Sequence, residues 1–86
     1  MNAHLAAERF LESPSLSAAT KRAYRTDVAE FLRWLGERDL ESVDVRVLVE
    51  YVGWLGTARG GRGKLAPTSV ARKLTAVRAF LRHSLG

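Results

Sequence analysis

The sequence predicts an all-α fold with four helices around one core. Apolar residues recur at the helical period in its longer segments, and no segment alternates apolar and polar residues as a strand would. Proline and glycine separate the periodic segments. With 86 residues and a hydrophobic fraction of 47%, the chain suits one globular domain over residues 1–86 and shows no internal repeat.

The first helix is expected over residues 3–12. Leu5, Phe10 and Leu11 are its apolar contributors. The segment Ser13-Pro14-Ser15 then ends it, because proline and the residue before it disfavour the helical conformation.

A longer helix is expected over residues 17–37, with Ser17 as its N-cap. Its core stripe consists of apolar and aromatic residues at helical spacing: Tyr24, Val28, Phe31, Leu32 and Leu35, bordered by Trp34. Lys21, Arg22 and Arg25 crowd the first two turns, where the helix dipole favours acids instead. A phosphate near this helix N-terminus would remove the conflict, which hints at a nucleic-acid role.

A third helix is expected over residues 44–58, after a polar connection at 36–42, with Asp44 as its cap. Its expected core residues are Val45, Leu48, Val49, Val52 and Leu55, with Tyr51 and Trp54 alongside. The glycine-rich, basic stretch at 59–64 reads as an interhelix loop able to touch phosphates.

The last helix is expected over residues 67–85, since Pro67 suits a first helical turn. Its apolar stripe falls at i, i+4, i+7 and i+11: Val70, Leu74, Val77 and Leu81. The face opposite that stripe is small and basic: Ser69, Arg72, Ala76 and Ala79, with Thr68, Lys73 and Thr75 at its margins. This helix has no acid, so we expect it to lie against a polyanion.

The charge is unevenly distributed along the chain. All nine acids lie in residues 1–50, which also hold seven bases, whereas residues 51–86 hold seven bases and no acid. This layout favours nucleic acid as the partner, an acidic membrane surface second, and an acidic neighbouring domain as a further alternative. Without cysteine, a secretory signal or an apolar run of roughly 18–20 residues, we expect a cytoplasmic location.

The sequence offers few parts for catalysis or metal binding, and we expect neither an enzyme nor a cofactor. His4 and His83 lie at opposite ends of the chain and have no His or Cys at ligand spacing. The carboxylate pairs Asp27/Glu30 and Asp39/Glu41 read as solvated or capping acids. Tyr24 and Tyr51 read as packing residues, because both border the expected core.

Two segments resemble the N-terminal core-binding domain of tyrosine recombinases, the phage-integrase and Xer family. The second helix of that domain is similar to the pattern Thr20-x-x-x-Tyr24-Arg25-x-Asp27-x-x-x-Phe31-x-x-Trp34-Leu35. Its last helix is similar to the pattern Leu65-Ala66-Pro67-Thr68-Ser69-Val70-x-Arg72-Lys73-Leu74-Thr75-Ala76-Val77-Arg78-x-Phe80. Each pattern alone is a weak motif, but both in this order, within a match over roughly residues 4–85, are a strong one.

The resemblance implies a compact orthogonal four-helix (SAM-like) bundle that clamps duplex DNA, with helices 17–37 and 67–85 in the major groove. The catalytic tyrosine of the family belongs to a separate C-terminal domain. We therefore expect this chain to be the DNA-binding part of a tyrosine recombinase, without the catalytic domain and unable to cleave DNA alone. The implied partners are double-stranded DNA, the catalytic domain of the parent chain and other recombinase subunits, with no membrane.

The resemblance also implies a set of DNA-contact residues by position. They are Thr20, Lys21, Arg22, Arg25, Arg62, Lys64, Thr68, Ser69, Arg72 and Lys73. Arg72 is the candidate base reader, because a guanidinium can bind guanine O6 and N7 together, with a phosphate contact or a surface ion pair as its alternative. Lys73, Lys64 and Arg62 are expected on phosphates, and Arg78 reads as a packing or ion-pair residue.

Two other classes of function remain open on the sequence alone. One is a helical protein-interaction module whose basic face meets an acidic protein, which predicts weak DNA binding. The other is a free-standing helix-turn-helix regulator, which predicts a dimer on a palindromic site. The connection at 59–65 is too long and too rich in glycine for a helix-turn-helix, which argues against the regulator.

Overall fold

The computed structural model describes residues 2–57 and 65–86, and every regular element in them is helical. The elements are α1 (Ala3–Leu11), α2 (Ala18–Leu35), the short 3-10 helix η1 (Leu40–Ser42), α3 (Val45–Leu55) and α4 (Pro67–Leu85). The prediction of an all-α fold with four helices is confirmed, with helix ends within three residues of the expected ones. The predicted basic loop at 59–64 lies outside the described residues.

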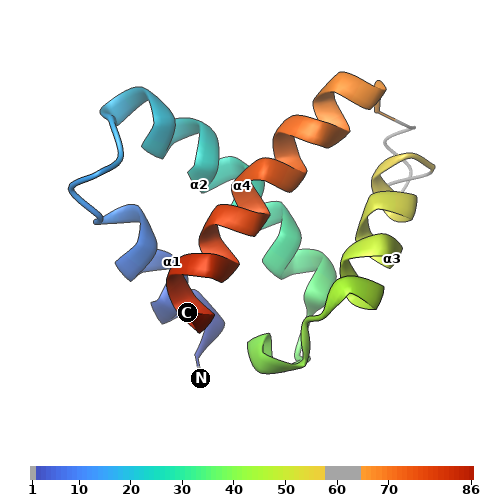
Figure 1. The fold of residues 1–86 in the computed structure, drawn as a ribbon, viewed down its shortest axis with the longest axis horizontal. Helices are drawn as coiled ribbons and strands as arrows, with labels where there is room; N and C mark the ends of the chain where they lie inside the picture. Colours follow the sequence, from blue (N-terminus) through green and yellow to red (C-terminus); the bar gives the residue numbers. More distant parts are fainter. Residues whose placement is uncertain (1, 58–64) are drawn as a thin grey trace.

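Two long helices form the centre of the molecule. α4 crosses in front of α2, and α1 and α3 lie on either side of this crossing (Figure 1). The contact between α2 and α4 is the most extensive in the fold, and α1 packs on both helices. The chain begins and ends in the lower part of Figure 1, whereas α2 begins at the upper left and α4 at the upper right.

Local sequence signals set the helix starts. Asn2, Ser17 and Asp44 each accept a hydrogen bond from the backbone N–H three residues on, at 3.0–3.1 Å. The predicted caps at Ser17 and Asp44 are thus confirmed. Helix α4 begins differently, with Pro67 in its first turn and no side-chain cap.

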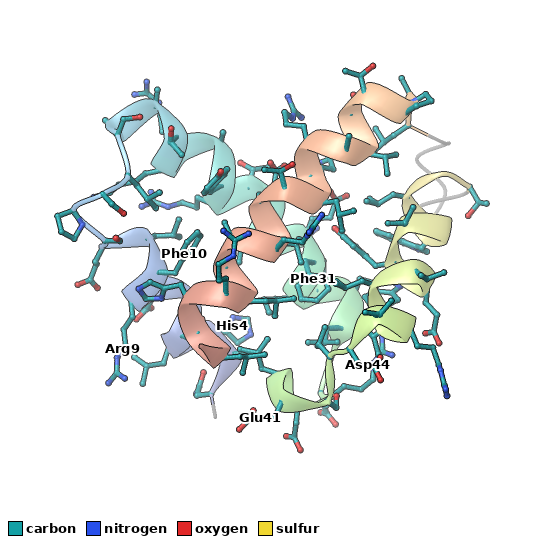
Figure 2. All side chains as sticks on the ribbon, viewed as in Figure 1. His4, Arg9, Phe10, Phe31, Glu41 and Asp44 are labelled. Atoms are coloured by element: carbon teal, nitrogen blue, oxygen red, sulfur yellow. The ribbon has the colours of Figure 1, made fainter. Side chains whose placement is uncertain are left out.

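Aromatic side chains join α2 to α3. The ring of Tyr51 lies 5.0 Å from the ring of Phe31, edge to face, and 5.0 Å from the ring of Trp34. Arg38 covers the Trp34 ring at 4.5 Å and donates from Nε to the carbonyl oxygen of Leu35 at 3.2 Å. Figure 2 shows Phe31 near the middle of the molecule, where this cluster meets the core.

A second aromatic group joins α1 to α2 and α4. The ring of Phe10 lies 5.9 Å from Tyr24, 5.7 Å from Phe80 and 5.5 Å from His83. In Figure 2, Phe10 lies between α1 and α4, whereas Arg9 of the same helix lies at the periphery. Both predicted packing tyrosines, Tyr24 and Tyr51, therefore have aromatic neighbours.

The prediction of which α3 residues face the core is partly wrong. Val45 and Val49 are 76% and 65% exposed, whereas Tyr51 and Leu55 are fully buried. Periodicity alone identified an apolar stripe, but the aromatic residues of α2 pack on the side of α3 that carries Tyr51. The connection before α3 also differs from expectation, because Leu40 in η1 is fully buried in a segment that we predicted to be polar.

The buried face of α4 is rotated about the helix axis from the face that we predicted. We expected Ala76 opposite the core, but it is fully buried together with Val77 and Phe80. The outer stripe residues Val70, Leu74 and Leu81 are only half-buried. The small side chain of Ala76 lies one turn after Lys73, on the side of α4 that packs against α2, so small size here serves helix packing and not the approach of a ligand.

Candidate nucleic-acid interface

The first halves of α2 and α4 carry eight of the ten candidate DNA-contact residues. Both reach the upper edge of the molecule in Figure 1, away from the chain ends. Neither helix has an acidic residue in its first turn. Helix α2 begins at the upper left and α4 at the upper right, and the two helices meet at their crossing, although their sequence positions are more than forty residues apart (Figure 1).

The candidates on α2 differ in exposure. Arg22 and Arg25 are exposed, whereas Thr20 and Lys21 are half-buried. The Thr20 hydroxyl accepts a hydrogen bond from Ser17 Oγ at 2.9 Å, so it takes part in the helix cap. Arg25 lines a groove between α1 and α2, which it shares with Arg33 and with Glu8 of α1.

The candidates on α4 divide in the same way. Thr68 and Arg72 are exposed, and Ser69 is half-buried. Arg78 is exposed too and lies beside Leu74 on the α3 side of α4, where it forms no ion pair with any described residue. Arg62 and Lys64 fall in the stretch that the structure does not describe.

The expectation for the side chain of Lys73 has to be revised. We expected its side chain to meet phosphates, but it is only 7% exposed. Its ammonium lies 3.0 Å from Asp27 Oδ1, to which it donates a hydrogen bond, and 2.8 Å from Glu30 Oε1. The rotation of α4 that buries Ala76 and Val77 carries Lys73 inward, where its ammonium faces these two carboxylates and not solvent.

The two carboxylates shape the acid–base behaviour of Lys73. Burial by itself favours the neutral amine, but the hydrogen bonds with Glu30 and Asp27, together with their charges, outweigh it. The pKa of Lys73 is therefore raised above its ordinary value of 10.5. The side chain remains an ammonium ion throughout the neutral pH range.

Asp27 and Glu30 also differ from expectation, because they are buried and not solvated. They are 3% and 6% exposed, and they are the only acids in α2, while α4 has none. The exposed charged side chains of these two helices are consequently all basic. They are Arg22, Arg25 and Arg33 on α2 and Arg72, Arg78 and Arg82 on α4.

Sequence reasoning missed this cluster of three charges. A signal was present, since Asp27 and Glu30 are one turn apart and border the stripe around Phe31. The partner of both acids is 46 and 43 positions further along the chain, and no local pattern connects residues at that separation.

Neither a metal-binding group nor a membrane-spanning helix is found among the described residues. Over 2–57 and 65–86, no group of three or more His, Cys, Asp and Glu side chains is arranged to hold a metal ion. Within the same ranges, no helix combines the length and the apolar character that crossing a bilayer requires.

Comparison with known proteins identifies the family. The family described as the phage integrase N-terminal SAM-like domain matches residues 7–84, which is nearly the whole chain. Searches among curated proteins and among solved structures found no significant match. The four-helix architecture agrees with the family match. The chain therefore belongs to the phage integrase N-terminal SAM-like domain family.

Proposed function

We propose that this domain binds duplex DNA in a sequence-specific manner, as the N-terminal clamp half of a tyrosine recombinase. Membership of the integrase family supports a DNA-binding, non-catalytic role within recombinases. Cleavage and rejoining of strands are the task of a catalytic domain in the parent chain. Other recombinase subunits are the further partners that this role requires.

One observation carries the proposal. The only two acids on the α2–α4 pair are buried against Lys73, so the exposed charges of both helices are positive. A surface with charges of one sign attracts a polyanion, and no carboxylate on these helices is left at the surface to repel phosphates. An ordinary solvated helix pair would mix both signs on its exposed faces.

The proposed contacts follow from exposure. Arg72 is the candidate base reader in the major groove, and Arg22 and Arg25 are phosphate contacts that set the orientation of the domain. Helix α4 has no side-chain cap, so the N–H groups of its first turn can donate to a phosphate oxygen beside Thr68 and Ser69. Lys21, Arg62 and Lys64 stay in the proposal as phosphate contacts, and Lys73 is removed from it.

The experiment that tests the proposal is fluorescence anisotropy on a labelled random-sequence duplex. We expect Arg72→Glu to raise the Kd roughly tenfold or more, because it replaces a groove contact by a repelling charge, while circular dichroism stays unchanged. The matched control is Arg46→Glu, which makes the same charge change at an exposed position on α3. Equal decreases in affinity from both variants would mean that Arg72 contributes only through the overall charge of the domain. Undiminished binding by Arg72→Glu would contradict the placement of α4 in the groove.

A second candidate, a protein-interaction module, is favoured by the apolar face of α3. Val45 and Val49 are exposed and line a groove with Leu74 and Arg78. Clusters of exposed apolar side chains commonly mark protein contacts. This alternative predicts weak duplex binding with little dependence on salt, which separates it from the first proposal.

A further inference from the structure

Three charged side chains meet inside the crossing of α2 and α4. Lys73 is 7% exposed, Asp27 is 3% exposed and Glu30 is 6% exposed. The Lys73 ammonium reaches both carboxylates, at 3.0 Å and 2.8 Å. The cluster therefore joins the two helices that carry the proposed DNA contacts.

A buried ionic cluster of this kind is an inefficient way to stabilise a helix junction. Moving charges out of water is costly, and apolar side chains of similar volume often serve a helix junction equally well. Buried ionic groups are better suited to fixing one arrangement among several, because an ammonium has to meet its partners at definite positions. Here one ammonium meets two acids that are a helical turn apart, which opposes both sliding and rotation of α4 along α2.

The position of Lys73 determines the direction of its neighbour. Adjacent residues on a helix point about 100° apart, so the rotation that turns Lys73 inward turns Arg72 toward solvent. On α2, Asp27 faces inward while Arg22 and Arg25 are exposed. A change in the pairing at the crossing would therefore redirect the basic side chains of both helices.

We propose that Lys73, Asp27 and Glu30 are positioning residues for DNA binding: they fix α4 against α2 so that Arg72 and the arginines of α2 engage one duplex together. This inference rests on the proposed function. Lys73 does not touch DNA in this arrangement. The two acids assist binding to a polyanion although they carry the same charge as the phosphates.

The expected assistance from the two acids distinguishes this proposal from a simple effect of net charge. Asp27→Asn combined with Glu30→Gln raises the formal net charge of the chain from +5 to +7. If only overall charge mattered, this variant would bind a random-sequence duplex more tightly, with an equal or steeper salt dependence. If the cluster positions the helices, the variant binds more weakly, because fewer phosphates are contacted at once.

The matched control neutralises two exposed acids outside the α2–α4 pair. Glu37→Gln with Asp39→Asn makes the same change in net charge at exposed positions. We expect this control to bind as well as the wild type or more tightly. A further variant, Asp27→Asn/Glu30→Gln/Lys73→Met, leaves no charge in the crossing and still raises the net charge to +6.

Anisotropy titrations across salt, at a temperature where circular dichroism shows native helicity, separate the outcomes. We expect both cluster variants to bind roughly tenfold more weakly than the wild type, with a salt slope shallower by about 0.9 for each phosphate that the variant no longer neutralises. Tighter binding, as in the control, would overturn the proposal. So would weaker binding with an unchanged slope, or absence of helicity in both variants at every temperature, since either result assigns the cluster to folding alone. Failure of the wild type to bind would instead refute the proposed function.

Discussion

The crossing of α2 and α4 and the outer face of α3 have opposite distributions of polarity. The crossing buries a lysine and two acids, whereas α3 exposes two valines, of which Val49 is 65% exposed. Both arrangements oppose the usual preference of charged residues for the surface and of apolar residues for the interior. We infer from the difference that the domain gains a specific geometry at the crossing, while α3 keeps an apolar surface.

The two regions also differ in their consequences for charge. Because the crossing takes up both acids of the α2–α4 pair, the exposed charges of that pair are all basic. On the α3 side, Arg38 and Glu50 keep opposite charges 3.8 Å apart at the surface. The exposed charges of the α2–α4 pair are therefore suited to a polyanion, whereas Arg38 and Glu50 mix both signs, as an ordinary protein surface does.

The largest effect on stability is expected from Lys73→Met. This change leaves Asp27 and Glu30 buried without their cation, and breaking a buried ion pair in this way costs about 3–5 kcal/mol. Urea unfolding followed by circular dichroism measures the decrease in stability. The matched control Arg72→Met removes a neighbouring but exposed cation, and we expect it to change the free energy of unfolding by no more than about 0.5 kcal/mol. Similar decreases from both variants would contradict the ionic role of the crossing.

A smaller effect is expected from a pair of identical changes at valines. Val77→Ala removes two methyl groups at a position with 0% exposure, and we expect it to cost about 2–3 kcal/mol. Val49→Ala makes the same change on the exposed face of α3, where we expect at most about 0.5 kcal/mol in either direction. Thermal or urea unfolding measures both. A large destabilisation at Val49 would mean that the outer face of α3 is covered in solution.

The smallest effect is expected from alkaline pH. Since the pKa of Lys73 is raised on folding above 10.5, its contribution to stability is complete below pH 10.5 and is lost as the pH rises through the folded value. The informative quantity is the difference in unfolding free energy between the wild type and Lys73→Met, because contributions that both proteins share cancel in it. We expect this difference to be constant from pH 7 to about 10 and to shrink above pH 10.5. A difference that stays constant to higher pH would show that Lys73 contributes through packing alone.

Local features of the fold were predictable from the sequence, and long-range ones were not. Ser17, Asp44 and Pro67 act on the turn that follows them, so their side-chain chemistry was enough to predict three helix starts. The family resemblance singled out the two helices that carry the basic residues as the ones expected to contact DNA. The inward side of α4 was not predictable, because the apolar period fits more than one rotation and the partner acids of Lys73 lie on another helix.

The exposure of Val49 has a related cause. An apolar stripe indicates that a helix buries one face, but it does not indicate which side the neighbouring helices cover. Tyr51 was placed beside the expected stripe, and its contacts with Phe31 and Trp34 determine the buried side of α3. Large aromatic side chains thus outweighed the valines in setting the orientation of the helix.

The salt dependence of duplex binding by the wild-type domain tests most directly whether the exposed basic charges of α2 and α4 bind DNA. Each phosphate contact contributes about −0.9 to the slope of log K against log salt. We expect binding at low salt with a slope of about −3 to −6, which corresponds to several simultaneous contacts. A flat dependence, or no binding at low salt, would contradict DNA binding by these helices and favour the protein-interaction module.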